Sequence, residues 1–374
     1  MMDALQGFAS WSVYGIPAFI FLITMVVFFH ELGHFSVARF FGVRVETFSI
    51  GFGPAIVKWT DRKGTLWKIS WIPLGGFVKF FGDADGASTP DREGVARMSA
   101  ADRAVAFPFK PLWQRALIVV AGPVANFILA FVILMGFYMA IGQVVAPAYV
   151  TTVKPGSAAA AAGIKPGDLF VKIDGESISG YQDVQRLISM SAGERLPIVV
   201  QRGGKLVSVF ATPRETEITD QFNNKIKVGL LGITNVGRKA FVRLGPLDAA
   251  GAAVAEVGDI VSLSFRAREQ IFRGNTSQLS GPVGILKLSG QVAAVSFVAL
   301  VQLVALLSVS IGLVNLFPIP LLDGGHLLYY ACEGVLGRPL GERAQDVGFR
   351  LGLAVVLGIF LLATWNDLVR LNLF

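Results

Sequence analysis

The sequence has few charged side chains and almost no cysteine. Charged residues make up 16% of its 374 residues, against about 25% in an average soluble chain. Hydrophobic residues make up 53%, and the mean hydropathy is +0.60. Such a chain is neither soluble throughout nor disordered in bulk. The single cysteine, Cys332, excludes a disulfide scaffold and a cysteine-cluster metal site.

The charge balance is basic, with 33 Lys and Arg against 26 Asp and Glu. A net charge of +7 could indicate a nucleic-acid partner. In a membrane protein it more often reflects cytoplasmic loops rich in Lys and Arg. We therefore expect a lipid bilayer as the partner of this chain, and no nucleic acid.

Long apolar runs are the main feature of the sequence. A helix needs about 20 residues to cross the hydrocarbon core of a bilayer. Four runs meet this length approximately: 13–35, 116–141, 292–317 and 351–365. The first could be a signal peptide, but it lacks a basic start and a small-residue cleavage site, so we expect a retained span.

Basic residues in short loops predict the orientation of these spans. Residues 36–113 contain eleven Lys and Arg, residues 327–350 contain three, and residues 1–12 contain none. We expect both basic loops on the cytoplasmic side and both termini outside the cytoplasm. The stretch 142–291 is then extracytoplasmic, and the inverted orientation is the alternative.

Short alternating strands replace the apolar runs from about residue 148 to residue 213. The spacing PGSAAAAAGIKPGDLFVKIDGESI resembles that of bacterial PDZ domains. The resemblance implies a β-rich domain over 142–215, with a groove that takes a peptide as an added strand. A spacer domain without a ligand is the alternative. In the linker 216–291, apolar positions at helical spacing predict a helix that lies on the membrane or packs on this domain.

The loop 43–82 reads as four apolar strands, TFSIGFG, AIVKWT, TLWKISWI and FVKFF, with DRKG as a hairpin turn. Gly75 and Gly76 belong to a set of glycines that would allow close backbone approach. We expect a membrane-associated β-element on the cytoplasmic side. A small packed sheet without a substrate role is the alternative. Residues 83–113 predict a polar cytoplasmic loop.

The first apolar run ends in the sequence HELGH. On a helix, His30 and His34 share a face and can bind one metal ion, and Glu31 lies close enough to act on water bound to that ion. Two of the three histidines of the chain belong to this motif. Such groups are costly in lipid unless they are paired or bind a metal.

A catalytic zinc site has three protein ligands and one open position. The segment NLFPIPLLDGGH follows the third run, and Pro318 and Pro320 end the helix there. Broken backbone at membrane depth is tolerated where it faces protein or a water-filled cavity. From the residues alone, Asp323 and His326 are both candidates for the third ligand.

Together these motifs resemble the signature of the site-2 proteases, which are intramembrane zinc metalloproteases: HELGH in a first span and N-x-F-P-x-P-x-L-D-G-G in a later one. GPVANF at residues 122–127 and IPLGGFVKF resemble the bacterial regulator-of-sigma-E branch. The resemblance implies Zn²⁺ bound by His30, His34 and Asp323, with Glu31 as the catalytic base. It also implies that Asn315 and the β-element with Gly75 and Gly76 hold an unwound substrate.

The sequence thus predicts a polytopic α-helical membrane protein with about four transmembrane helices, a cytoplasmic-side β-element and one extracytoplasmic PDZ-like β-rich domain. The protease core would comprise residues 1–141 and 292–374. We expect cleavage of single-span proteins, such as anti-sigma factors or remnant signal peptides, in a bacterial inner membrane, with a pre-cleaved end or peptide at the PDZ-like domain. The alternatives are an inactive PDZ-bearing scaffold and a metal transporter. Well-known relatives carry two PDZ domains, whereas one is recognisable here.

Overall fold

A computed structural model describes residues 2–84, 92–145, 147–178, 180–219, 225–235, 240–272 and 281–370. The chain folds into two compact units. The first comprises residues 1–136 and 248–374, and the second comprises residues 137–247.

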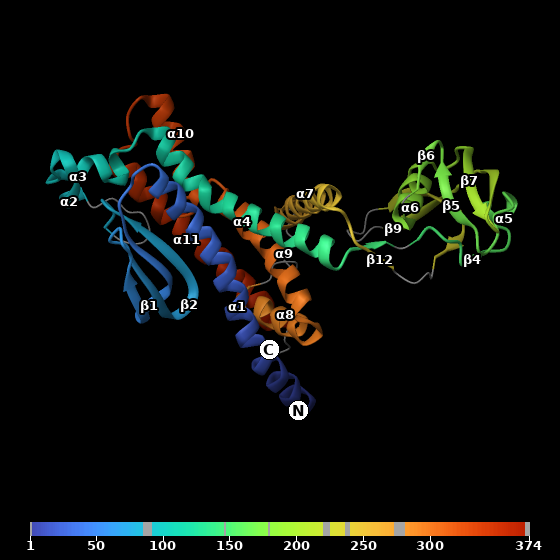
Figure 1. Cartoon of the computed structure of the whole chain (residues 1–374), viewed down its shortest axis with the longest axis horizontal. Coiled ribbons are helices and arrows are strands. Elements are labelled where there is room, and N and C mark those ends of the chain that lie inside the picture. Colours follow the sequence, from blue (N-terminus) through green and yellow to red (C-terminus); the bar gives the residue numbers. More distant parts are fainter. Residues whose placement is uncertain are drawn as a thin grey trace. The chain divides into compact units, whose positions relative to one another are not determined.

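The first unit is built mainly of helices, drawn with the labels of Figure 1. Four of the described helices are long and apolar enough to cross a membrane, as the sequence predicts. They are α1 (Met2–Phe40), α4 (Leu112–Ala140), α9 (Phe297–Asn315) and α11 (Glu342–Arg370). Shorter helices complete the unit: α2 (Arg92–Ala96), α3 (Ala100–Val105), the 3₁₀ turn η1 (Phe107–Phe109), α8 (Pro282–Val295) and α10 (Asp323–Leu336), with most of α7 (Pro246–Phe272).

The third apolar run differs from its predicted bounds. Its first residues belong to α8, which ends at Val295. Ser296 interrupts the helix, and α9 begins at Phe297. The Ser296 hydroxyl accepts a hydrogen bond from the Ala299 amide at 3.0 Å, as an N-cap residue does. Hydropathy does not register this break, because both helices are apolar.

The β-element forms two long antiparallel strands, β1 (Val45–Thr60) and β2 (Leu66–Phe80), beside α1 (Figure 1). The first part of β1 pairs with both parts of β2: Phe48 lies opposite Val78 and also opposite Trp67. Four short predicted strands are therefore two strands with register shifts. Gly75 has a φ of +128°, a conformation that favours glycine.

Aromatic packing attaches this hairpin to the first helix. Phe48 is fully buried, and its ring contacts Phe28 and Phe35 of α1 and Trp67 of β2, with centroids 5.9, 5.5 and 4.3 Å away. The closed end is tied to the same helix, because Arg39 donates to Asp61 at 2.5 Å. The helix that contains HELGH and the hairpin are thus one packed body.

The second unit is rich in strands. A four-stranded sheet has the order β6-β5-β7-β8, and its inward-facing side chains form one apolar core with helix α6. These elements are β5 (Leu169–Ile173), β6 (Glu176–Ser177), α6 (Tyr181–Met190), β7 (Leu196–Arg202) and β8 (Lys205–Ala211). The remaining ones are α5 (Ala158–Ala161) and the paired strands β3 (Gln143–Val145) with β12 (Ala240–Val242), β4 (Thr152–Val153) with β11 (Ile233–Thr234) and β9 (Arg214–Thr219) with β10 (Lys225–Leu230).

Candidate metal centre

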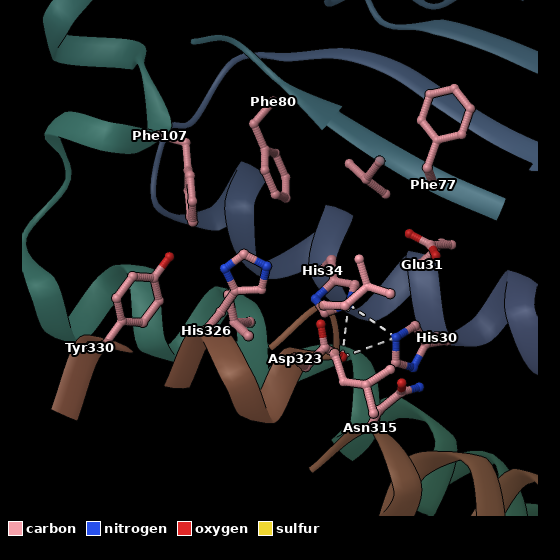
Figure 2. Close-up of a pocket in the computed structure, with 14 residues that line it drawn as sticks. His30, Glu31, His34, Phe77, Phe80, Phe107, Asn315, Asp323, His326 and Tyr330 are labelled. Carbon is pink, nitrogen blue, oxygen red and sulfur yellow. Dashed lines mark hydrogen bonds and ion pairs between the residues drawn. The ribbon is translucent and has the colours of Figure 1, made fainter. Parts of the chain in front are cut away.

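The two histidines of HELGH face one carboxylate from a distant part of the chain. His30 Nε2 lies 3.1 Å from Asp323 Oδ2, and His34 Nε2 lies 3.5 Å from the same atom. The two Nε2 atoms are 3.2 Å apart. Figure 2 shows the three side chains converging on one point from α1 and from the start of α10.

These separations fit a zinc ion. Tetrahedral ligands about 2.1 Å from a zinc ion lie about 3.4 Å from one another, and the three distances range from 3.1 to 3.5 Å. The donor set of two imidazoles and a carboxylate is the kind that catalytic zinc sites use. Among the described residues, His30, His34 and Asp323 are the group that could hold a metal ion.

A strained loop delivers the carboxylate. Asp323 begins α10, where the helix dipole favours a negative charge. The preceding Leu321 has a φ of +101°, which is costly for a branched residue. Gly324 allows the tight turn, because a Cβ atom there would overlap the Leu316 and Phe317 carbonyl oxygens. The loop thus places Asp323 opposite the histidines.

Two of the other predicted residues line the same pocket, which has a volume of about 200 Å³, and the two predicted glycines do not. Glu31 and Asn315 both border it. The backbone amide of Val78 in β2 donates a hydrogen bond to the Glu31 carboxylate. Gly76 lies beside this carboxylate as well, since a Cβ atom there would be 3.2 Å from Glu31 Cγ. Gly75 instead faces the ring of Phe52.

His326, the competing third ligand, lies on another wall of the pocket. It is one turn further along α10, between Asp323 and Tyr330 (Figure 2), and its ring stands edge-on to Tyr329, with centroids 6.4 Å apart. Burial lowers the pKa of His326 and favours its neutral form. It is not among the three groups whose ligand atoms converge.

Three groups at the site are missing from the sequence-based prediction, and all belong to α4. The Ile118 carbonyl accepts a hydrogen bond from His34 Nδ1 at 2.9 Å, Gly122 lies against the His34 ring, and Asn126 lies 3.3 Å from His30 Nδ1. A backbone carbonyl has no residue-type signal. Gly122 and Asn126 belong to the GPVANF segment, which is the sequence signal that could have indicated them.

Four apolar helices and a candidate metal-ligand cluster with a glutamate beside it are typical of a metal-dependent peptidase embedded in a membrane. The model of peptidase family M50 matches residues 18–359, so the chain belongs to this family, the site-2 protease family. It is a zinc metalloprotease and a multi-pass membrane protein.

Several curated proteins are similar to it over almost their whole length. The "Putative zinc metalloprotease" of Agrobacterium fabrum is 45% identical over 99% of this chain and 100% of that protein. The metalloprotease MmpA of Caulobacter vibrioides is 40% identical over 96% of each chain. Among solved structures, the PDZ domain of an SdrC-like protein from Listeria innocua aligns with 25% of this chain and 96% of its own, at 24% identity and a TM-score of 0.20.

Proposed function

We propose that the protein hydrolyses peptide bonds within the transmembrane segment of single-span membrane proteins, with His30, His34 and Asp323 as zinc ligands and Glu31 as the catalytic base. The convergence of the three ligand atoms on one point beside Glu31 is the observation that carries this proposal. Anti-sigma factors and remnant signal peptides are the substrate classes that we favour, since the sequence resembles the branch that cuts them.

Each chain group has a part in this reaction. Zinc supplies Lewis acidity toward the scissile carbonyl and toward the attacking water. Glu31 takes a proton from that water and passes it to the leaving amine. The Val78 amide orients the Glu31 carboxylate by its hydrogen bond. Asn315, on the pocket wall, donates from its side-chain amide to the substrate backbone.

The hairpin supports a substrate in extended form. A transmembrane helix hides its carbonyls in i→i−4 hydrogen bonds, so the substrate must unwind before it is cut. Residues 76–80 of β2 pair with residues 45–50 on one side, and Phe77 and Val78 line the pocket. Among the described strands, none pairs with the edge of this segment that faces the pocket. An unwound substrate added at that edge regains backbone hydrogen bonds.

The location of the parts follows from the charge pattern. The basic loops support a cytoplasmic position, at a bacterial inner membrane, for the hairpin and for the ends of α1 and α10 that adjoin these loops. The termini and the β-rich unit would then lie outside the cytoplasm. We assign to that unit a PDZ-like role, in which it receives the pre-cleaved end of a substrate or excludes bulky ones. The sequence pattern of residues 142–215 supports this assignment.

A Glu31→Gln variant tests the proposal. We expect the purified protein to cut tagged single-span proteins whose extracytoplasmic part has been removed, at a bond inside the span. The variant should retain stoichiometric zinc and give no product. Equal cleavage by both proteins would remove Glu31 from the mechanism. Partner binding without cleavage by either protein would favour the inactive scaffold.

A further inference from the structure

The GPVANF segment of α4 has no part in the proposed reaction, yet it faces both zinc-ligand histidines. Ile118, Gly122 and Asn126 are four residues apart, so they form one stripe on α4. His30 and His34 form the matching stripe on α1. Each of the three α4 residues contacts one of the two imidazoles.

The contacts of His34 fix the tautomer and the position of its ring. The Ile118 carbonyl can only accept, so Nδ1 carries the proton and donates over 2.9 Å. Nε2 then has a free lone pair directed at the ligand cluster. Gly122 leaves the space for this orientation, because a Cβ atom there would overlap Nε2 and Cε1 of the ring. No residue larger than glycine fits while the ring stays in place.

Asn126 has the corresponding position at His30. Its side chain is fully buried, and its amide lies 3.3 Å from His30 Nδ1. A His30 that binds metal through Nε2 has a proton on Nδ1, which needs an acceptor. The amide Oδ1 of Asn126 is buried and has no hydrogen-bond partner among the described residues. Half a turn of the amide brings Oδ1 to Nδ1 and satisfies both groups.

Helix α9 holds Asn126 in this place from the other side. A Cβ atom at Gly312 would lie 3.2 Å from Asn126 Cβ and 3.2 Å from the Pro123 carbonyl oxygen. The backbones of α4 and α9 therefore approach closely here. Asn126 is enclosed between the helix that bears the histidines and the helix that leads to Asn315 and Asp323.

We propose that Asn126 is a positioning residue of the metal centre, whose Oδ1 accepts a hydrogen bond from His30 Nδ1. The Ile118 carbonyl accepts the corresponding hydrogen bond from His34 Nδ1, and Gly122 leaves space for the His34 ring. The stripe thus aims both Nε2 atoms at one point before zinc binds. Hydrogen bonds of this kind fix the tautomer of a ligand histidine and raise metal affinity 10- to 100-fold. The inference rests on the ligand set of the proposed function.

Zinc affinity of the full-length, detergent-purified chain tests this, by competition with a chelator of known affinity. Asn126→Leu removes the acceptor and keeps the approximate shape, so we expect zinc binding about 10- to 100-fold weaker. Asn126→Asp retains an acceptor and should bind zinc more tightly than Asn126→Leu, with an affinity close to that of the original chain. Ser308→Ala is the matched control. It removes a buried hydroxyl of α9 that has no described partner, and it should leave zinc affinity unchanged.

Gly122→Ala and Gly136→Ala give a second test on the same helix. A Cβ atom at Gly136 has nothing within 4 Å, so Gly136→Ala should bind zinc normally while Gly122→Ala loses it. Nitrogen NMR of the zinc-loaded, histidine-labelled chain needs no variant. It should show both Nδ1 atoms protonated and both Nε2 atoms bound to metal.

Equal zinc affinity for Asn126→Leu and Ser308→Ala would overturn the inference, as would equal affinity for the two alanine variants or a zinc bond through His30 Nδ1. A weakened Asn126→Asp that matches Asn126→Leu would exclude the acceptor role. Failure of the proposed function looks different: the unaltered chain would then bind no zinc, or would bind zinc and leave single-span substrates intact.

Discussion

The stability of the closed end of the β1–β2 hairpin should depend on one carboxylate, that of Asp61. Burial alone would raise the pKa of Asp61, but hydrogen bonds from Trp67 Nε1, from the Thr65 and Lys63 amides and from Arg39 lower it to about 2. The ordinary pKa of an aspartate is 3.8. A gap of this size corresponds to at most roughly 2 kcal/mol of stabilisation of the closed end in its ionised form, since solvent screens this partly exposed carboxylate.

The Asp61→Asn variant keeps the shape and removes the charge. We expect the opening of residues 55–70 to become more frequent at pH 7, by up to about 30-fold, which is the factor that 2 kcal/mol gives. Hydrogen exchange of the full-length protein measures this directly. The pH dependence has a definite sign. Because the folded pKa is depressed, the stabilisation is complete above about pH 4 and is lost as the pH falls toward 2.

The Asp61→Asn variant should show no such pH dependence. Lys63→Ala is the control, because it keeps the backbone amide that donates a hydrogen bond to Asp61. Unchanged exchange in Asp61→Asn would refute the reasoning. So would a closed end of the unaltered hairpin that opens equally at pH 3 and pH 7.

Three further changes have expected outcomes. Removal of zinc by a chelator should abolish cleavage and lower the melting temperature, because a ligand that binds the folded state stabilises it. Addition of Zn²⁺ should restore the activity and the melting temperature. A metal-free protein with full activity would contradict this. Phe48→Ala should destabilise the hairpin by about 3–5 kcal/mol, since it removes a fully buried ring. Amide hydrogen exchange at residues 45–50 and 76–80 measures the effect, and protection equal to that of the original chain would argue against it. In the β-rich unit, Asp168 has no exposed side-chain area and Arg202 donates to it at 2.7 Å. Burial raises the pKa of this carboxyl, but the hydrogen bonds and charge of Arg202 lower it overall. The unit should therefore lose stability as the pH falls below about 4, and Arg202→Met should remove this acid sensitivity in exchange experiments.

Much of the membrane body could be predicted because its signals are local. Apolar runs predict the spans, and an i, i+4 spacing on one helix predicts that His30 and His34 share a face. The helix break at Ser296 was missed because hydropathy averages over both helices, although a serine before an apolar run is an N-cap signal. The double pairing of Phe48 was missed because it depends on register shifts, which turn geometry and side-chain packing determine together.

The proposed third ligand, Asp323, shows how far local sequence signals can predict the site. The residues alone left Asp323 and His326 equal, since both follow the prolines that stop α9. Only the fold separates them: the backbone at Leu321 and the close approach at Gly324 turn the first residue of α10 toward α1, while His326 lies one turn away.

Close backbone contacts between helices bring together the two parts of the candidate metal centre, which are the histidines of α1 and the Asp323 carboxylate of α10. A Cβ atom at Gly33, between the two histidines, would overlap the Ala121 carbonyl oxygen of α4, and one at Gly352 of α11 would overlap the Pro320 carbonyl oxygen in the loop before Asp323. Each segment that bears a proposed ligand is thus in close contact with a neighbouring helix at a glycine. Small residues allow such approach where the apolar surroundings give helices little other reason to associate. The separations of 3.1 and 3.5 Å between Asp323 and the two histidines, which lie almost 300 positions away in the sequence, therefore depend on these helix contacts. A single methyl group at either glycine should disturb the candidate metal centre without replacing a proposed ligand.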